Sequence, residues 1–114
     1  MSKTKVIVKF PQSEPYLLDM DIDIKVAQKI IGGYVEYVPI PGTSFEFIVD
    51  NEHCFKDTKP NIVYGEQVIK GPIIVRKCGA DNRVVDLDEK DIESIQRLLK
   101  YSALTEEGSW MHSI

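Results

Sequence analysis

Cysteine is scarce in this 114-residue chain, which holds only Cys54 and Cys78. The two lie far apart and form no CxxC pair. A disulfide scaffold or a four-ligand zinc site is therefore poorly supported in a reducing compartment. Two thiols in a domain of this size are most simply interpreted as small hydrophobic core residues.

Long hydrophobic runs are absent as well. Apolar stretches such as Ile73–Val75 are far shorter than the about 20 residues that a membrane span needs. Residues 1–10 interleave lysines with apolar residues and lack the apolar run of a secretory signal. We therefore expect a soluble, cytoplasmic protein with no membrane partner.

No strong excess of basic charge exists, since 18 acidic residues outnumber 14 basic ones and give a net charge of −4. This balance weakens nucleic-acid wrapping and anionic-membrane docking as modes that use the whole surface. The hydrophobic fraction of 43% and the charged fraction of 28% are typical of a soluble globular domain. We expect a single domain over residues 1–103 and a tail over residues 104–114 that is frayed or docked by Trp110.

Local patterns predict the elements of this domain. Alternating side chains predict strands, in two hairpins, at residues 5–10, 16–20, 34–39 and 45–49. Residues 22–31 carry apolar side chains at helical spacing, with Asp21 and Asp23 at the start and Gly32-Gly33 at the end. They predict a short helix that a left-handed glycine closes.

Periodicity fails between Asp50 and Gly71, where we expect an irregular connection, and connections of this length are often functional. Residues 73–77 and 84–85 predict two strands, and a second helix follows with a capping box from Asp86 to Glu89. Its apolar stripe consists of Ile92, Ile95, Leu98 and Leu99. The order predicts an α+β fold with a single mainly antiparallel sheet of five to six strands and two helices on one face.

Catalytic and metal-binding patterns are sparse. Only two histidines could serve as a base, and no nucleophile elbow occurs. His53, Cys54, Cys78 and His112 could in principle hold zinc, but their spacing is not that of a zinc finger. We therefore predict no catalytic residue, no metal site, no cofactor and no enzymatic activity.

Basic residues gather near the last predicted strands. With residues of the irregular connection they could line one basic, aromatic groove that binds a phosphate. The set is Lys70, Arg76, Lys77 and Arg83, joined by Lys56, Lys59 and Tyr64. Charged side chains at solvated strand ends explain the same pattern, and this alternative is favoured.

Tyr34 and Glu36 lie at strand spacing two and share one face. If that face is not the core, they form with Asn51 and Asn61 a polar and aromatic surface that could grip a partner. The favoured alternative packs Tyr34 on the first helix and uses the two asparagines to satisfy turn backbone.

Five short elements carry a resemblance to a known family: Gln28, Gly32–Glu36, Asp50–Glu52, Lys59–Asn61 and Ile69–Ile73. Over about residues 5–100 the chain resembles a small domain of unknown function that is common in phages and other mobile elements of Gram-positive bacteria and in their hosts. It departs from the family's usual pattern at residues 53–56, where His-Cys-Phe-Lys replaces a glycine-rich stretch. The resemblance implies a phage or bacterial cytoplasmic protein and implies no reaction.

These observations predict a non-enzymatic interaction protein of phage or mobile-element origin that acts on a host or phage protein. An alternative is a protein that binds or sequesters a nucleotide signal in phage counter-defence, using the basic groove. A homodimer through a sheet edge or the exposed sheet face is a further expectation, since outer strands must be paired or protected.

Overall fold

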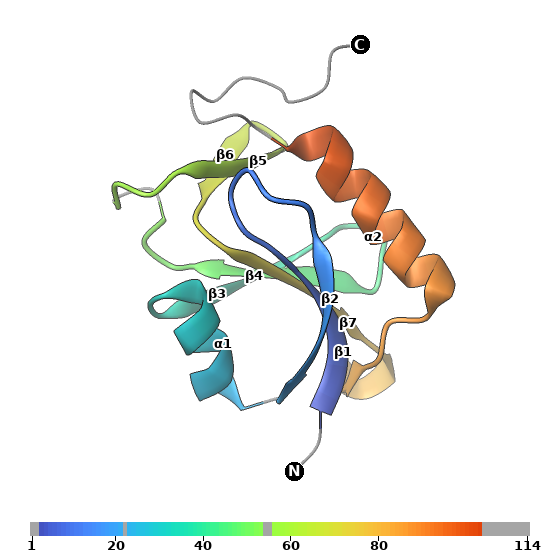
Figure 1. Ribbon diagram of the computed structural model, residues 1–114. Helices are drawn as coiled ribbons and strands as arrows, with labels where there is room; N and C mark the ends of the chain where they lie inside the picture. The colour runs from blue at the N-terminus through green and yellow to red at the C-terminus, as the bar shows by residue number, and fades with distance from the viewer. Residues whose placement is uncertain (1–2, 22, 54–55, 104–114) are drawn as a thin grey trace.

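The computed structural model describes residues 3–21, 23–53 and 56–103 (Figure 1). The strands are β1 (Lys3–Lys9), β2 (Tyr16–Asp21), β3 (Val35–Pro39), β4 (Phe45–Asp50), β5 (Pro60–Tyr64), β6 (Gln67–Lys70), β7 (Ile73–Cys78) and β8 (Val84–Val85). The helices are α1 (Ile24–Ile31), the short 3₁₀ helix η1 (Ala80–Asn82) and α2 (Glu89–Ser102). The predicted α+β fold is confirmed. The tail predicted for residues 104–114 lies outside the described residues.

Six strands form the main sheet, and every pairing in it is antiparallel. The strand order is β2-β1-β7-β4-β3, and β8 pairs with β7. Strands β2 and β3 therefore lie at its two outer edges. The predicted antiparallel sheet of five to six strands is confirmed.

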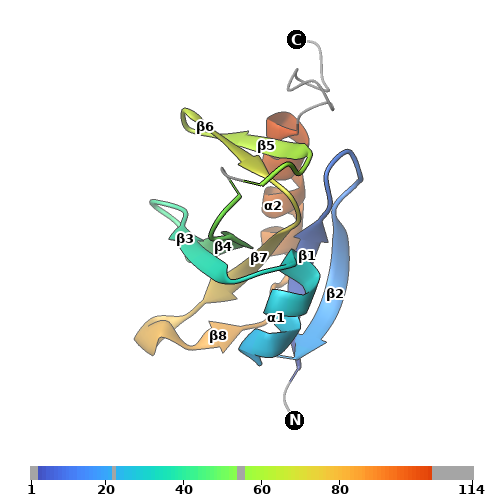
Figure 2. The same ribbon diagram turned by 90° about the vertical axis from the view of Figure 1, so that its left-hand side faces the viewer.

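The two helices pack on opposite faces of this sheet, so their predicted placement on one face is wrong (Figure 2). The face under α1 buries Val6, Val8, Ile48 and Ile74 against Ala27 and Ile31. The face under α2 buries Ile7, Phe47, Val49, Ile73 and Val75 against Ile95 and Leu99. The central strands carry apolar residues on both faces, and each face needs its own cover.

The connection between β4 and β7 contains a hairpin where the sequence predicted irregular chain. Strands β5 and β6 pair antiparallel as a separate two-stranded sheet, which adds Ile62 and Ile69 to the core beneath α2. The register shifts between Pro60 and Ile62, which disrupts the period of two that would have predicted a strand. Gly65 begins the tight turn with φ +64°, a conformation that glycine adopts without strain.

Caps define both ends of α1 and the start of α2. Asp23 caps α1 by accepting a hydrogen bond from the backbone N–H of Lys25 at 3.0 Å. The capping box of α2 joins Asp88 and Asp91, so its predicted placement at Asp86 and Glu89 is wrong. Asp86 instead accepts a hydrogen bond from the backbone N–H of Lys5 on β1. Neither helix of the described part is long and apolar enough to cross a membrane.

Candidate functional site: the surface around Tyr34

A two-glycine turn carries the chain from α1 into β3. Gly32 closes the helix with φ +88°, and its N–H donates to the carbonyl oxygen of Gln28 at 2.8 Å. Gly33 donates to the same carbonyl at 3.2 Å. The predicted glycine cap is confirmed. A residue with a Cβ would be strained at Gly32, because its backbone lies in the left-handed region.

An ion pair between the buried Asp50 and the partly exposed Lys56 supports this turn. The Asp50 carboxylate is almost completely buried, and it accepts hydrogen bonds from the Lys56 Nζ at 2.6 Å and from the backbone N–H of Glu52 at 2.8 Å. Lys56 also donates to the carbonyl of Gly32 at 3.4 Å. The side chain of Lys56 thus ties the connection after β4 to the end of α1.

The electrostatics of Asp50 follow from this arrangement. Burial alone would raise its pKa, but the hydrogen bonds from Lys56 and Glu52 and the charge of Lys56 outweigh burial and lower the pKa below its ordinary value. A Cβ on Gly33 would lie 2.7 Å from the Lys56 Nζ and 3.4 Å from an Asp50 oxygen. Glycine at position 33 therefore lets the ion pair approach the backbone of the turn.

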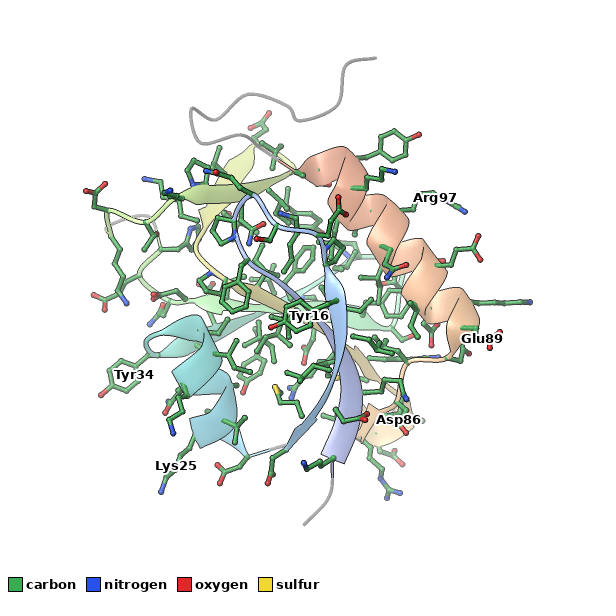
Figure 3. The ribbon with its side chains drawn as sticks, in the orientation of Figure 1. Tyr16, Lys25, Tyr34, Asp86, Glu89 and Arg97 are labelled. Atoms are coloured by element: carbon green, nitrogen blue, oxygen red, sulfur yellow. The ribbon has the colours of Figure 1, made fainter. Side chains whose placement is uncertain are left out.

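Tyr34 projects from the turn into solvent. Its side chain is 73% exposed, and Figure 3 shows it pointing away from the body of the molecule. Its carbonyl accepts a hydrogen bond from the Asn51 backbone N–H at 2.8 Å, so the backbone is fixed while the ring is free of the core. A shallow hollow of about 220 Å³ is lined by Tyr34, Gln28 and Gly33. The favoured expectation that Tyr34 packs on the first helix is wrong.

Three of the residues predicted for a partner-binding face are exposed in this region. We define the Tyr34 surface as Tyr34, Glu36 and Asn51, together with Gln28 and Gly33, which line the hollow. Asn61, the fourth predicted residue, is completely buried and does not belong to this surface.

Asn61 instead holds a buried lysine. Its Oδ1 accepts from the Lys9 Nζ at 2.6 Å, and its Nδ2 donates to the carbonyls of Lys9 and Gly71, each at 2.8 Å. The prediction that Asn61 satisfies backbone groups is thus confirmed. Lys9 is only 2% exposed, and burial lowers its pKa, an effect that the charge of Glu14 partly offsets. The sequence reasoning missed Lys9, although it shares a strand face with the core residue Ile7.

The predicted basic groove does not form around Arg76 and Lys77, because neighbouring residues of β7 point to opposite faces of the sheet. The Arg76 Nε donates to Glu46 at 2.6 Å, and its guanidinium lies 4.7 Å from the centre of the Tyr37 ring. The Lys77 Nζ donates to Asp91 of α2 at 2.9 Å. Both cations are therefore paired with carboxylates of the same chain.

The remaining residues of the predicted groove are dispersed. Tyr64 packs edge-on against Phe47 in the core, with ring centres 5.1 Å apart. Lys59 and Arg83 are exposed on separate segments of the chain, and Lys70 is partly buried on β6.

Metal-binding and thiol groups are few. Within residues 3–21, 23–53 and 56–103, no cluster of three or more His, Cys, Asp or Glu side chains could hold a metal ion. His53 is buried, and its Nδ1 accepts from the backbone N–H of Lys70 at 3.4 Å. Cys78 is partly exposed, so its predicted place in the hydrophobic core is wrong. Burial and its hydrogen bond to Glu46 raise the pKa of its thiol. Cys54 lies outside the described residues.

Comparison with family models shows the family of this chain. The family model described as "Domain of unknown function (DUF3846)" matches residues 4–100. The chain belongs to the DUF3846 family. No curated protein and no solved structure matches it. The match covers β1 through most of α2, so the DUF3846 domain comprises the main sheet, the β5–β6 hairpin and both helices.

Proposed function

We propose that this DUF3846 protein is a non-enzymatic interaction protein of phage or mobile-element origin. It binds a host or phage protein in the cytoplasm, and it does so through the Tyr34 surface. The observation that carries the proposal is the 73% exposure of Tyr34 on a backbone that is fixed on both sides.

Rigid presentation of an aromatic ring favours binding. The Gly32 cap, the Asp50–Lys56 ion pair and the Asn51 hydrogen bond already order this turn in the free protein. Binding then costs little further backbone entropy, and a tyrosine ring supplies a large contact area for only two side-chain torsions. Tyrosine is among the residues most enriched where a few side chains supply most of the binding energy.

The surroundings of Tyr34 suit a protein partner. The hollow beside the ring could receive one apolar side chain of that partner. Exposed polar and charged residues, Lys29, Glu36 and Asn51, lie on the elements next to it. An aromatic centre with a polar rim is the usual composition of a protein interface.

The alternative of a nucleotide-binding protein draws less support from the geometry. A nucleotide phosphate needs several cationic groups directed at one point. Arg76 and Lys77 lie on opposite faces and are paired with Glu46 and Asp91. We therefore prefer the protein partner.

Two matched tyrosine variants test the proposal. Purified wild-type protein and Tyr34→Ala would be used to capture partners from a host lysate, and the captured protein would then be titrated calorimetrically. Tyr101→Ala is the control, since Tyr101 is 67% exposed but lies on α2. We expect Tyr34→Ala to weaken the complex at least about tenfold and Tyr101→Ala to leave it unchanged. Equal affinity of the wild type and Tyr34→Ala would contradict the proposal.

A further inference from the structure

The outer edge of β3 carries backbone groups that no described residue satisfies. Hydrogen bonds join Tyr34 to Asn51 and Ile40 to Phe45 across the β3–β4 pair. In an antiparallel pair such bonds recur at every second residue. The backbone groups of residues 34, 36, 38 and 40 therefore face β4, and those of Val35, Tyr37 and Pro39 face outward.

The pattern of outward groups is self-complementary. Val35 and Tyr37 each offer one N–H and one carbonyl, while Pro39 offers only a carbonyl. If two β3 strands run antiparallel with Tyr37 opposite Tyr37, the Tyr37 N–H groups donate to the Tyr37 carbonyls. The N–H of Val35 then donates to the carbonyl of Pro39. Each backbone N–H that faces outward then has an acceptor. Because Pro39 has no N–H, the carbonyl of Val35 is the one outward group on each strand that stays without a partner.

We propose that β3 pairs antiparallel with β3 of a second copy of this chain, about a two-fold axis at Tyr37. The two main sheets join into one continuous sheet. A two-fold contact between identical patches is the commonest symmetry of homodimers.

Charge disfavours the register centred on Glu36. Glu36 is the only charged residue of β3, and in the proposed register it lies opposite Val38 of the second copy. A register centred one residue earlier would place Glu36 opposite Glu36, and like charges directly opposite are unfavourable. A register centred on Val35 would need the backbone of Gly33, which the turn after α1 already uses.

Side chains near the axis also suit a second copy. Tyr37 is 39% exposed, and in the dimer its ring lies beside the Tyr37 ring of the other copy, where aromatic pairs across strands are favourable. Arg76, whose guanidinium lies over the Tyr37 ring, is neutralised by Glu46 at 2.6 Å. No unpaired charge of Arg76 or Glu46 is therefore brought to the axis.

The opposite edge of the sheet is less suited to pairing. Strand β2 carries the carboxylates of Asp19 and Asp21, and charged residues on an edge strand oppose the addition of another strand. β3 is therefore the edge at which a second copy pairs.

Sedimentation velocity over a concentration series tests the dimer. A five-residue strand pair buries less area than a permanent dimer needs, so we expect monomer and dimer to exchange, with a dimer fraction that rises with concentration. Tyr37→Lys places two like charges at the axis and should remain monomeric throughout, with an unchanged far-UV circular dichroism spectrum. Leu17→Lys, a matched change of an exposed residue on β2, should dimerise as the wild type does.

Cysteine cross-linking tests the register. In a background with Cys54→Ser and Cys78→Ser, Glu36→Cys protein mixed with Val38→Cys protein should form a disulfide-linked heterodimer under mild oxidation. These two positions form a close, non-hydrogen-bonded pair across the axis, where side chains approach closely enough for a disulfide. A mixture of Leu17→Cys and Asp19→Cys on β2 measures cross-linking by random collision.

Three results would overturn the inference. They are a wild type that stays monomeric at every concentration, a heterodimer yield no greater than that of the β2 mixture, and a Glu36→Cys protein that cross-links mainly to itself. Self-association and capture of a host protein by Tyr34 are measured separately. Failure of the dimer therefore leaves the proposed function to its own test.

Discussion

The buried contact between Lys9 and Asn61 gives the sharpest prediction about stability. Replacing Asn61 by alanine removes three hydrogen bonds of 2.6, 2.8 and 2.8 Å at once. The carbonyls of Lys9 and Gly71 lose a donor, and the ammonium of Lys9, a residue that is only 2% exposed, loses its nearest acceptor. Each buried group left without a partner costs about 1–3 kcal/mol, and charged groups cost more.

We therefore expect Asn61→Ala to lower the free energy of unfolding by about 3–5 kcal/mol, a large share of the roughly 5–15 kcal/mol that stabilises a domain. Urea denaturation followed by far-UV circular dichroism measures this loss as a lower midpoint at constant slope. Asn51→Ala is the matched control, because Asn51 is exposed and uses its backbone N–H to bond Tyr34. Its effect should stay within about 0.5 kcal/mol.

A double-mutant cycle separates the contribution of the Lys9 ammonium from that of the two backbone carbonyls that Asn61 contacts. Lys9→Met removes the buried ammonium, so a subsequent Asn61→Ala change should cost about 1–3 kcal/mol less than it does in the wild type. The reasoning would be refuted by a loss below about 1 kcal/mol for Asn61→Ala, or by costs for the two changes that simply add.

Three further changes test the caps and the ion pair on α2. Gly32→Ala should destabilise the protein by about 1 kcal/mol in thermal or urea unfolding, because φ at this position is +88°. Asp88→Ala should lower the free energy of unfolding by about 1 kcal/mol through loss of the capping box of α2. Loss of stability with no loss of α2 helicity would be inconsistent with local capping. Burial would raise the pKa of Asp91, but the hydrogen bonds from the backbone N–H of Asp88 and from Lys77 lower this pKa below 3.8. The ionised Asp91 carboxylate therefore stabilises the folded protein above that pH, and this contribution is lost as the pH falls further. The hydrogen bond from Lys77 to Asp91 raises the pKa of Lys77 above 10.5, so the contribution of this ion pair to stability persists up to that pH and is lost at higher pH. The free energies of unfolding of the wild type and Asp91→Asn, measured at several pH values, should therefore differ less at both extremes of pH.

Several elements could be predicted from local sequence because their cause is local. The glycines after Ile31 close α1, and the stripe of Ile95 and Leu99 defines the buried side of α2. Such patterns depend on backbone geometry over a few residues, and the sequence shows them directly. The same period of two also separates Arg76 from Lys77, a consequence that the predicted groove overlooked.

The candidate site was predicted only in part. Spacing identified Tyr34 and Glu36 as one face of an extended segment, but exposure of the Tyr34 ring depends on how α1 and the braced turn lie beside it. The Asp50–Lys56 pair bridges the connection after β4 to the end of α1, and no repeat in the sequence indicates it.

By itself, the sequence determined both helices, the point where α1 ends, and the strands of the main sheet, but not the β5–β6 hairpin. Only the tertiary structure decided that α1 and α2 take opposite faces, and that Lys9 meets Asn61 from 52 positions away. The physical reason is that dihedral preferences and side-chain periods act between neighbours, whereas burial free energy depends on which distant surfaces fit together.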